Sequence, residues 1–200
     1  MENKTPIKID MFEKILANSN DCLEKAITVL KNGGIIVYPT DTIYGFGCDA
    51  KDGEAIKRLN KIKGRSSPMS VLCPSLRRLP SWTTLNHDER VFVEKKLNPQ
   101  TTIIVPVRDD VVSDLILGEE TTLGIRISNH PFCVSIARSY SNPITTTSVN
   151  RSGNKPLSNP EEIESEFSNE IELCIDDGIL DNEGSKIYKY QNKSWSLIRQ

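Results

Sequence analysis

Residues 21–47 read DCLEKAITVLKNGGIIVYPTDTIYGFG, and this stretch decides the fold class. Its first part predicts a helix over residues 21–32, capped by Asp21 with Glu24, because apolar residues recur there at helical spacing (Leu23, Ala26, Ile27 and Leu30). Two glycines then end the helix. Residues 35–38 form a short, wholly apolar run, typical of a strand that is buried on both faces. Pro39 ends that strand because it has no N–H to donate.

The same alternation of helix and strand continues along the chain. Further helices are expected over residues 53–62 behind Asp52, over 88–97 behind Asn86, from 131 to about 140, and from 160 behind Asn159. Strands are expected at 69–72, 102–107, 123–127 and 144–147, followed by a hairpin of 186–190 with 195–198 that turns at 191–193. No repeat or linker interrupts the pattern. We therefore expect one α/β domain over residues 1–200 with a twisted mixed sheet, a core from about residue 15 and an N-terminal extension at 1–10.

Composition narrows the class of protein. The 25 Lys and Arg residues nearly balance the 27 Asp and Glu residues, which disfavours a protein that coats nucleic acid or membrane with its whole surface. Five scattered cysteines without a Cys-x-x-Cys pair, and only two histidines, support neither a zinc site nor a disulfide framework. No run approaches the length of a membrane span, and residues 1–10 lack the apolar segment of a signal peptide. We expect a soluble, cytoplasmic protein with reduced thiols.

Four polar segments follow or interrupt the expected elements. Residues 38–47 combine hydroxyls, a carboxylate and two glycines after a buried strand, and are either a binding loop or an ordinary polar turn. Lys63 and Arg65 follow a helix, where they either bind an anion such as phosphate or simply stabilise the helix end. Arg126 lies within an apolar strand and requires an anion, which is either a core carboxylate or a ligand. Residues 145–153 place four hydroxyls, an amide and a guanidinium at a strand's end, the usual place for a ligand in an open α/β sheet, although a Thr-rich strand entering a turn has the same pattern.

Taken in order, these segments resemble the YrdC family. The resemblance rests on residues 37–45 (VYPTDTIYG), 63–65 (KGR), 124–127 (GIRI), 130–131 (HP) and 147–153 (TSVNRSG), and it extends from about residue 23 to 199. The family's hallmark Lys-x-Arg and Ser-x-Asn are Lys63/Arg65 and Ser148/Asn150. The resemblance implies an α/β twist similar to a double-stranded-RNA-binding domain, with a large, positively lined concave cavity. It implies an enzyme, a nucleotidyltransferase that makes threonylcarbamoyl-AMP and pyrophosphate from L-threonine, bicarbonate and ATP for the modification of tRNA adenosine-37.

The same resemblance implies a set of site residues. Catalysis is assigned to Lys63, Arg65, Ser148 and Asn150. ATP is expected to contact these four together with Thr122, Pro156 and Arg199, whereas threonine is expected to contact Thr42, Tyr44, Arg126, Thr146 and Ser185. Mg²⁺ is expected to arrive with ATP, with no metal ligand from the protein and no tightly bound cofactor. Further partners implied are tRNA or double-stranded RNA and the downstream threonylcarbamoyl-transferase machinery.

Departures from the family pattern leave rival interpretations. The loop after Arg65 (Ser66-Ser67-Pro68) is about two residues short, and Asn98–Thr102 and Gly184–Lys186 replace the usual Pro-Gly-Pro-x-Thr and Pro-Ser-Thr. One rival is a paralogue of the YciO type with another nucleotide or carbamoyl reaction. The other is a non-catalytic double-stranded-RNA binder, which the acidic balance and the lack of a basic stripe disfavour.

Overall fold

A computed structural model describes residues 12–66, 68–191 and 193–199. The expected extension at 1–10 and Asn192 of the expected tail turn lie outside these residues. The helices are α1 (Cys22–Lys31), α2 (Gly53–Lys63), α3 (Leu79–Trp82), α4 (His87–Glu94), α5 (Pro131–Ser139) and α6 (Pro160–Phe167), with short 3₁₀ turns at Leu76–Arg78, Asp114–Ile116 and Glu119–Thr121. The strands are β1 (Glu13–Leu16), β2 (Ile36–Tyr38), β3 (Gly45–Gly47), β4 (Ser70–Leu72), β5 (Thr101–Pro106), β6 (Thr122–Arg126), β7 (Ile144–Ser148), β8 (Leu173–Asp176), β9 (Lys186–Gln191) and β10 (Ser194–Arg199).

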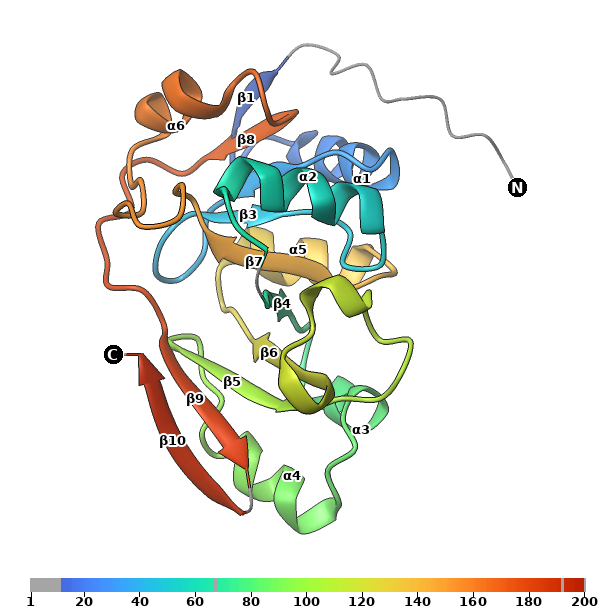
Figure 1. Ribbon diagram of the computed structural model, residues 1–200. Coiled ribbons are helices and arrows are strands. Elements are labelled where there is room, and N and C mark those ends of the chain that lie inside the picture. The colour runs from blue at the N-terminus through green and yellow to red at the C-terminus, as the bar shows by residue number, and fades with distance from the viewer. Residues whose placement is uncertain (1–11, 67, 192, 200) are drawn as a thin grey trace.

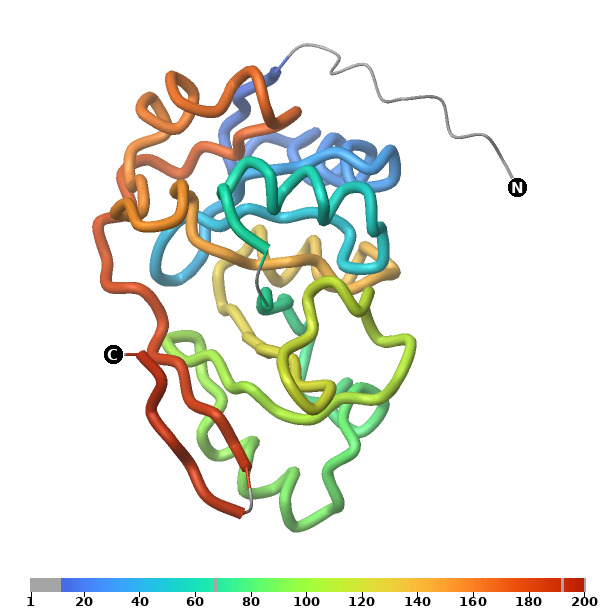
Figure 2. Tube along the Cα trace, viewed as in Figure 1, coloured from blue at the N-terminus to red at the C-terminus, as the bar shows by residue number. Residues whose placement is uncertain are grey.

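The described strands form one mixed, twisted sheet in the order β1-β8-β2-β3-β7-β4-β6-β5-β9-β10. Strand β7 joins its two halves, because it pairs antiparallel with β3 on one side and with β4 on the other. The chain trace shows how the two halves are built (Figure 2). The half with β1, β8, β2 and β3 comes from the beginning of the chain and from residues after β7, whereas the half with β4, β6, β5, β9 and β10 comes from the middle of the chain and the C-terminal hairpin. The α/β class and the twisted mixed sheet predicted from the sequence are confirmed.

Helices cover both faces of the β1–β7 half (Figure 1). Ile35 and Val37 belong to the core that contains α2 and α6, whereas Ile36 and Tyr38 belong to the core that contains α1 and α5. Successive strand residues point to opposite faces, so a run of four apolar residues satisfies two cores at once. The burial expected for this run is therefore confirmed.

The helix ends follow their capping residues with one exception. Asp52 accepts hydrogen bonds from Glu54 N and Ala55 N, and Asn86 forms a reciprocal capping box with Glu89. The predicted cap at Asp21 is wrong, since its side chain makes no cap bond and instead contacts Ser19 and Lys25. Strands β1, β3 and β8 were not predicted. None of the helices in the described part of the chain is long and apolar enough to cross a membrane.

Candidate functional site

A cleft of about 220 Å³ opens on one face of the sheet. Seven strands that are neighbours in the sheet contribute to its lining, from β3 through β7, β4, β6, β5 and β9 to β10. Their contributions are, in that order, Gly45, Thr146 to Ser148, Ser70, Arg126, Thr102, Ile187 and Arg199; Thr40, Ile43, Tyr44, Arg65, Pro68, Met69 and Ser185 complete the lining. The twist of the sheet brings side chains from distant parts of the chain to one concave surface.

The charge of this cleft is entirely positive. Its lining residues include three arginines, Arg65, Arg126 and Arg199, and neither an aspartate nor a glutamate. Burial lowers the pKa of Arg199, and the positive charge of Arg65 lowers it further. Cations held this close, with no acidic residue in the same lining, favour an anionic ligand.

Arg126 is the most constrained of the three. Its side chain is 5% exposed, and Nη2 donates to Thr42 Oγ1 at 2.8 Å and to Pro99 O at 3.1 Å. Nε is buried and has no hydrogen-bond partner within the described part of the chain, and burial lowers the pKa of the guanidinium. Among the described residues no carboxylate forms an ion pair with Arg126, so the structure does not provide the core salt bridge that the sequence left open. A buried guanidinium with a free N–H beside a cleft is suited to bind a ligand carboxylate.

The two hallmark motifs meet at the other side of the cleft. The Lys63 ammonium lies 2.6 Å from Ser148 O, 3.0 Å from Asn150 O and 3.1 Å from Asn150 Oδ1. Ser148 Oγ donates to the same Asn150 Oδ1 at 2.6 Å. Ser148 and Arg65 line the cleft, whereas Lys63 is buried beneath it and Asn150 stands behind Ser148. The ammonium thus points at the 148–150 turn and not into the cleft where phosphates were expected.

The C-terminal hairpin builds one wall. Ser185 Oγ and Thr102 Oγ1 are 2.8 Å apart, and Arg199 Nη2 donates to Ser185 O at 3.1 Å. Ser185 and Arg199 therefore line the same cleft as residues of the 40–45 segment.

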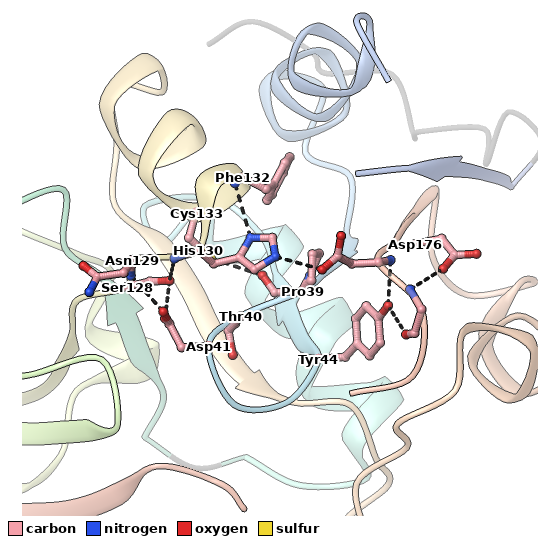
Figure 3. Close-up of polar contacts among 12 residues, drawn as sticks. Pro39, Thr40, Asp41, Tyr44, Ser128, Asn129, His130, Phe132, Cys133 and Asp176 are labelled. Atoms are coloured by element: carbon pink, nitrogen blue, oxygen red, sulfur yellow. Dashed lines mark hydrogen bonds and ion pairs between the residues drawn. The ribbon is translucent and has the colours of Figure 1, made fainter. Parts of the chain in front are cut away.

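The loop before β3 is held from two sides (Figure 3). Asp41 accepts hydrogen bonds from the Ser128 hydroxyl and from Asn129 N, and His130 Nε2 lies 3.1 Å from Asp177 Oδ2. The Tyr44 hydroxyl accepts from Asp177 N and donates to Gly178 O. Burial raises the pKa of this phenol above its ordinary value. These contacts fix the loop whose Thr42 meets Arg126.

The expected site residues fall into three groups. Seven line the cleft: Tyr44, Arg65, Arg126, Thr146, Ser148, Ser185 and Arg199. Thr42, Lys63 and Asn150 contact lining residues without being lining residues themselves. Thr122 donates its hydroxyl to Glu119 O, and Pro156 lies exposed in the loop after the 148–150 turn, so neither lines the cleft.

Several lining residues were not singled out from the sequence, namely Thr40, Ser70, Thr102 and Ile187. Alternation along β5 and β9 would have identified the faces of Thr102 and Ile187, but not which face is concave. For a metal ion, the described residues hold no group of three His, Cys, Asp or Glu side chains that could act as ligands. The cationic lining of the cleft does not fit a resident divalent cation.

A curved α/β sheet that presents three arginines to one cleft defines a protein built to bind small anionic molecules. The chain belongs to the Sua5/YciO/YrdC family, whose model, described as "Telomere recombination", matches residues 28–200. A curated relative from Aliivibrio fischeri, named threonylcarbamoyl-AMP synthase, is 30% identical over 183 residues, covering 89% of this chain and 98% of its own. A relative from Chromohalobacter salexigens with the same name is 27% identical and covers 80% of this chain and 86% of its own. The resemblance to the YrdC family is confirmed.

Solved structures share the fold. Escherichia coli YciO superposes with a TM-score of 0.83 at 21% identity, covering 95% of this chain and 94% of its own. Sua5 from P. abyssi in complex with L-threonine superposes with a TM-score of 0.83 at 24% identity, covering 94% of this chain and 57% of its own. At these identities the two structures establish the fold and not the substrate.

Proposed function

We propose that this protein is a threonylcarbamoyl-AMP synthase, an enzyme that joins L-threonine, bicarbonate and ATP. The observation that carries the proposal is the unpartnered Nε of buried Arg126 in a cleft lined by three arginines and no acid. The name shared by the curated relatives supports it, since these relatives match most of the chain.

In this proposal the cleft has an amino-acid end and a nucleotide end. Arg126, held by Thr42, binds the threonine carboxylate, and Tyr44, Thr146 and Ser185 surround the rest of threonine. Arg65 and Arg199 neutralise the ATP phosphates beside Ser148, with Mg²⁺ as part of the MgATP substrate. Lys63 and Asn150 act at the same end, through the contacts described below. Thr122 and Pro156 have only the resemblance as support for a role at the nucleotide.

The chemistry requires three substrates to meet. The threonine amine forms an N–C bond to bicarbonate carbon with loss of water, and a carbamate oxygen then attacks the α-phosphorus as pyrophosphate leaves. Charge neutralisation and proximity within one cleft supply the rate enhancement, and no side chain is assigned as a general base. The product carries an activated threonylcarbamoyl group, and we propose that a downstream transferase passes this group to adenosine-37 of tRNA.

The test is threonine-dependent release of pyrophosphate from ATP, with incorporation of labelled bicarbonate. Arg126→Lys keeps the charge but loses the fork, so threonine should bind more weakly by about 1.5–3 kcal/mol, while ATP affinity without threonine changes little. Calorimetric titration measures both affinities. Arg138→Lys, the same change on an exposed residue of α5, is the matched control.

Two outcomes would contradict the proposal. Pyrophosphate release that does not depend on threonine would favour a YciO-type reaction, and RNA binding without turnover would favour the RNA binder. Normal threonine binding by Arg126→Lys, together with a lower melting temperature, would make Arg126 a purely structural residue.

A further inference from the structure

Lys63 is a buried cation with no acidic partner. Lys63 is 2% exposed, and its ammonium lies 5.6 Å from the centre of the Phe46 ring. The described residues include no carboxylate that forms an ion pair with this ammonium. The main chain at Lys63 is held as well, because its carbonyl accepts from Ser152 N at 2.8 Å. Burying a charge is unfavourable unless hydrogen bonds compensate for the lost water.

The compensation comes from a single turn. An ammonium has three N–H donors, and Ser148 O, Asn150 O and Asn150 Oδ1 provide three acceptors within 3.1 Å. All of them belong to the turn at the end of β7. None of the three donors remains for a phosphate.

These contacts also determine how the Asn150 amide is oriented. An ammonium can only donate, so the Asn150 oxygen must face it, while Nδ2 donates to Arg151 O at 3.0 Å and to Asn154 O at 2.7 Å. The Ser148 hydroxyl must then give its proton to Asn150 Oδ1. Because Ser148 lines the cleft and has given its proton to Asn150, its hydroxyl oxygen is left as a hydrogen-bond acceptor there.

We propose that Lys63 is a positioning residue that clamps the Ser148–Asn150 turn and orients the Ser148 hydroxyl, while Arg65 alone of the Lys-x-Arg pair meets the ligand. The kinetic test of this inference rests on the proposed function, whereas the test by melting temperature does not. The two residues of one motif thus differ in role, because Gly64 turns the chain between them and leaves Arg65 exposed in the cleft.

A double-mutant cycle tests the clamp with Lys63→Met, Asn150→Ala and the double variant. If the two residues act through each other, each single change should lower kcat by about 10- to 100-fold with the KM for ATP changed less than about threefold, and the double variant should be no worse than the more severe single one. Arg65→Ala should instead raise the KM for ATP. Lys61→Met, the same change on an exposed lysine of the same helix turn, is the control and should leave the rate unchanged.

A direct phosphate contact predicts the opposite pattern. Lys63→Met would then raise the KM for ATP in the same proportion as Arg65→Ala and would add to Asn150→Ala, which would overturn the clamp. If Lys63→Met does not fold, Lys63→Arg distinguishes the two interpretations. A direct phosphate contact predicts that this variant keeps its activity, because the positive charge is retained. The clamp predicts that kcat falls, because a guanidinium cannot reproduce the three hydrogen bonds of the ammonium.

The melting temperatures of the same variants test the clamp without any assay of activity. Non-additive shifts for Lys63→Met and Asn150→Ala support the clamp even if threonine-dependent turnover is absent, in which case only the proposed function fails. Additive shifts would overturn the clamp whatever reaction the protein performs.

Discussion

Lys63 shows how the surroundings of one residue set its ionisation. Burial, together with the positive charge of Arg65, lowers the pKa of Lys63 from 10.5 to about 8. Above that pH the clamp loses a proton and one hydrogen bond. The reference for this effect is Lys63→Arg, a variant that stays charged. We expect the ratio of wild-type kcat to Lys63→Arg kcat to fall by up to about tenfold per pH unit above pH 8. Taking the ratio cancels the ionisation of the threonine amine, and a flat ratio would contradict the prediction.

The same ionisation should affect stability in the opposite direction. Because the pKa is lower in the folded than in the unfolded protein, the unfolded chain binds more protons between about pH 8 and 10.5. The free energy of unfolding of the wild type relative to Lys63→Met should rise across this window, by at most about 1.4 kcal/mol per pH unit. The comparison with Lys63→Met is needed because burial raises the pKa of the cysteine thiols, including Cys48 and Cys133, which acts oppositely at high pH.

Helix α2 shows how one element delivers two side chains to different places. It ends at Gly64, whose φ of 67° is left-handed and whose N–H bonds to Asn60 O and Lys61 O. A Cβ at Gly64 would meet nothing within 4 Å, so a substitution there is opposed by backbone strain alone. We expect Gly64→Ala to reduce the free energy of unfolding by about 1 kcal/mol, measured by urea denaturation.

Gly53→Ala, at the first residue of the same helix, is the control. Its Cβ would lie 3.6 Å from Leu115 Cδ1, an ordinary contact, and alanine favours the helix. This variant should be neutral or up to about 1 kcal/mol more stable. Equal destabilisation by the two changes would show that the left-handed turn at Gly64 is not what matters.

At the scale of the whole molecule, the cleft depends on the sheet being continuous. Its walls come from residues 40–45 at one side and from Ser185 and Arg199 at the other, and β7 connects the two halves. Hydrogen exchange should be slowest in β7, which is paired on both sides, and faster in β10, which lies at the edge of the sheet.

Ligands should alter this pattern at one place. ATP with threonine should slow exchange in β9 and β10 relative to the free protein, because Arg199 and Ser185 join the ligand to the hairpin. The exposed residues Asp109 and Asp110, which do not line the cleft, serve as the internal reference and should not change. Protection that appears around Asp109 and Asp110 but not in the hairpin would contradict the proposed nucleotide end of the cleft.

Local sequence patterns predicted most of the helices and strands, but not which strands pair with one another. The 21–32 helix, the 35–38 strand and the caps at Asp52 and Asn86 were predictable because each depends on residues within one or two turns. Strands β1, β3 and β8 are three or four residues long, and each pairs with a strand far along the chain: β1 with β8, β3 with β7 and β8 with β2. Strands of this length are too short to show a recognisable alternation of apolar and polar residues, so these three were not predicted.

The sequence by itself determined the class of fold, the family and seven of the residues that line the cleft, because the motifs are local and occur in a characteristic order. Only the tertiary structure decided which of those residues form hydrogen bonds with one another. The Arg126 guanidinium donates to Thr42, 84 residues away, and the Lys63 ammonium donates to Ser148 O, 85 residues away. Burial removes water from these charges, and the acceptors that replace it belong to strands that the twist of the sheet brings together.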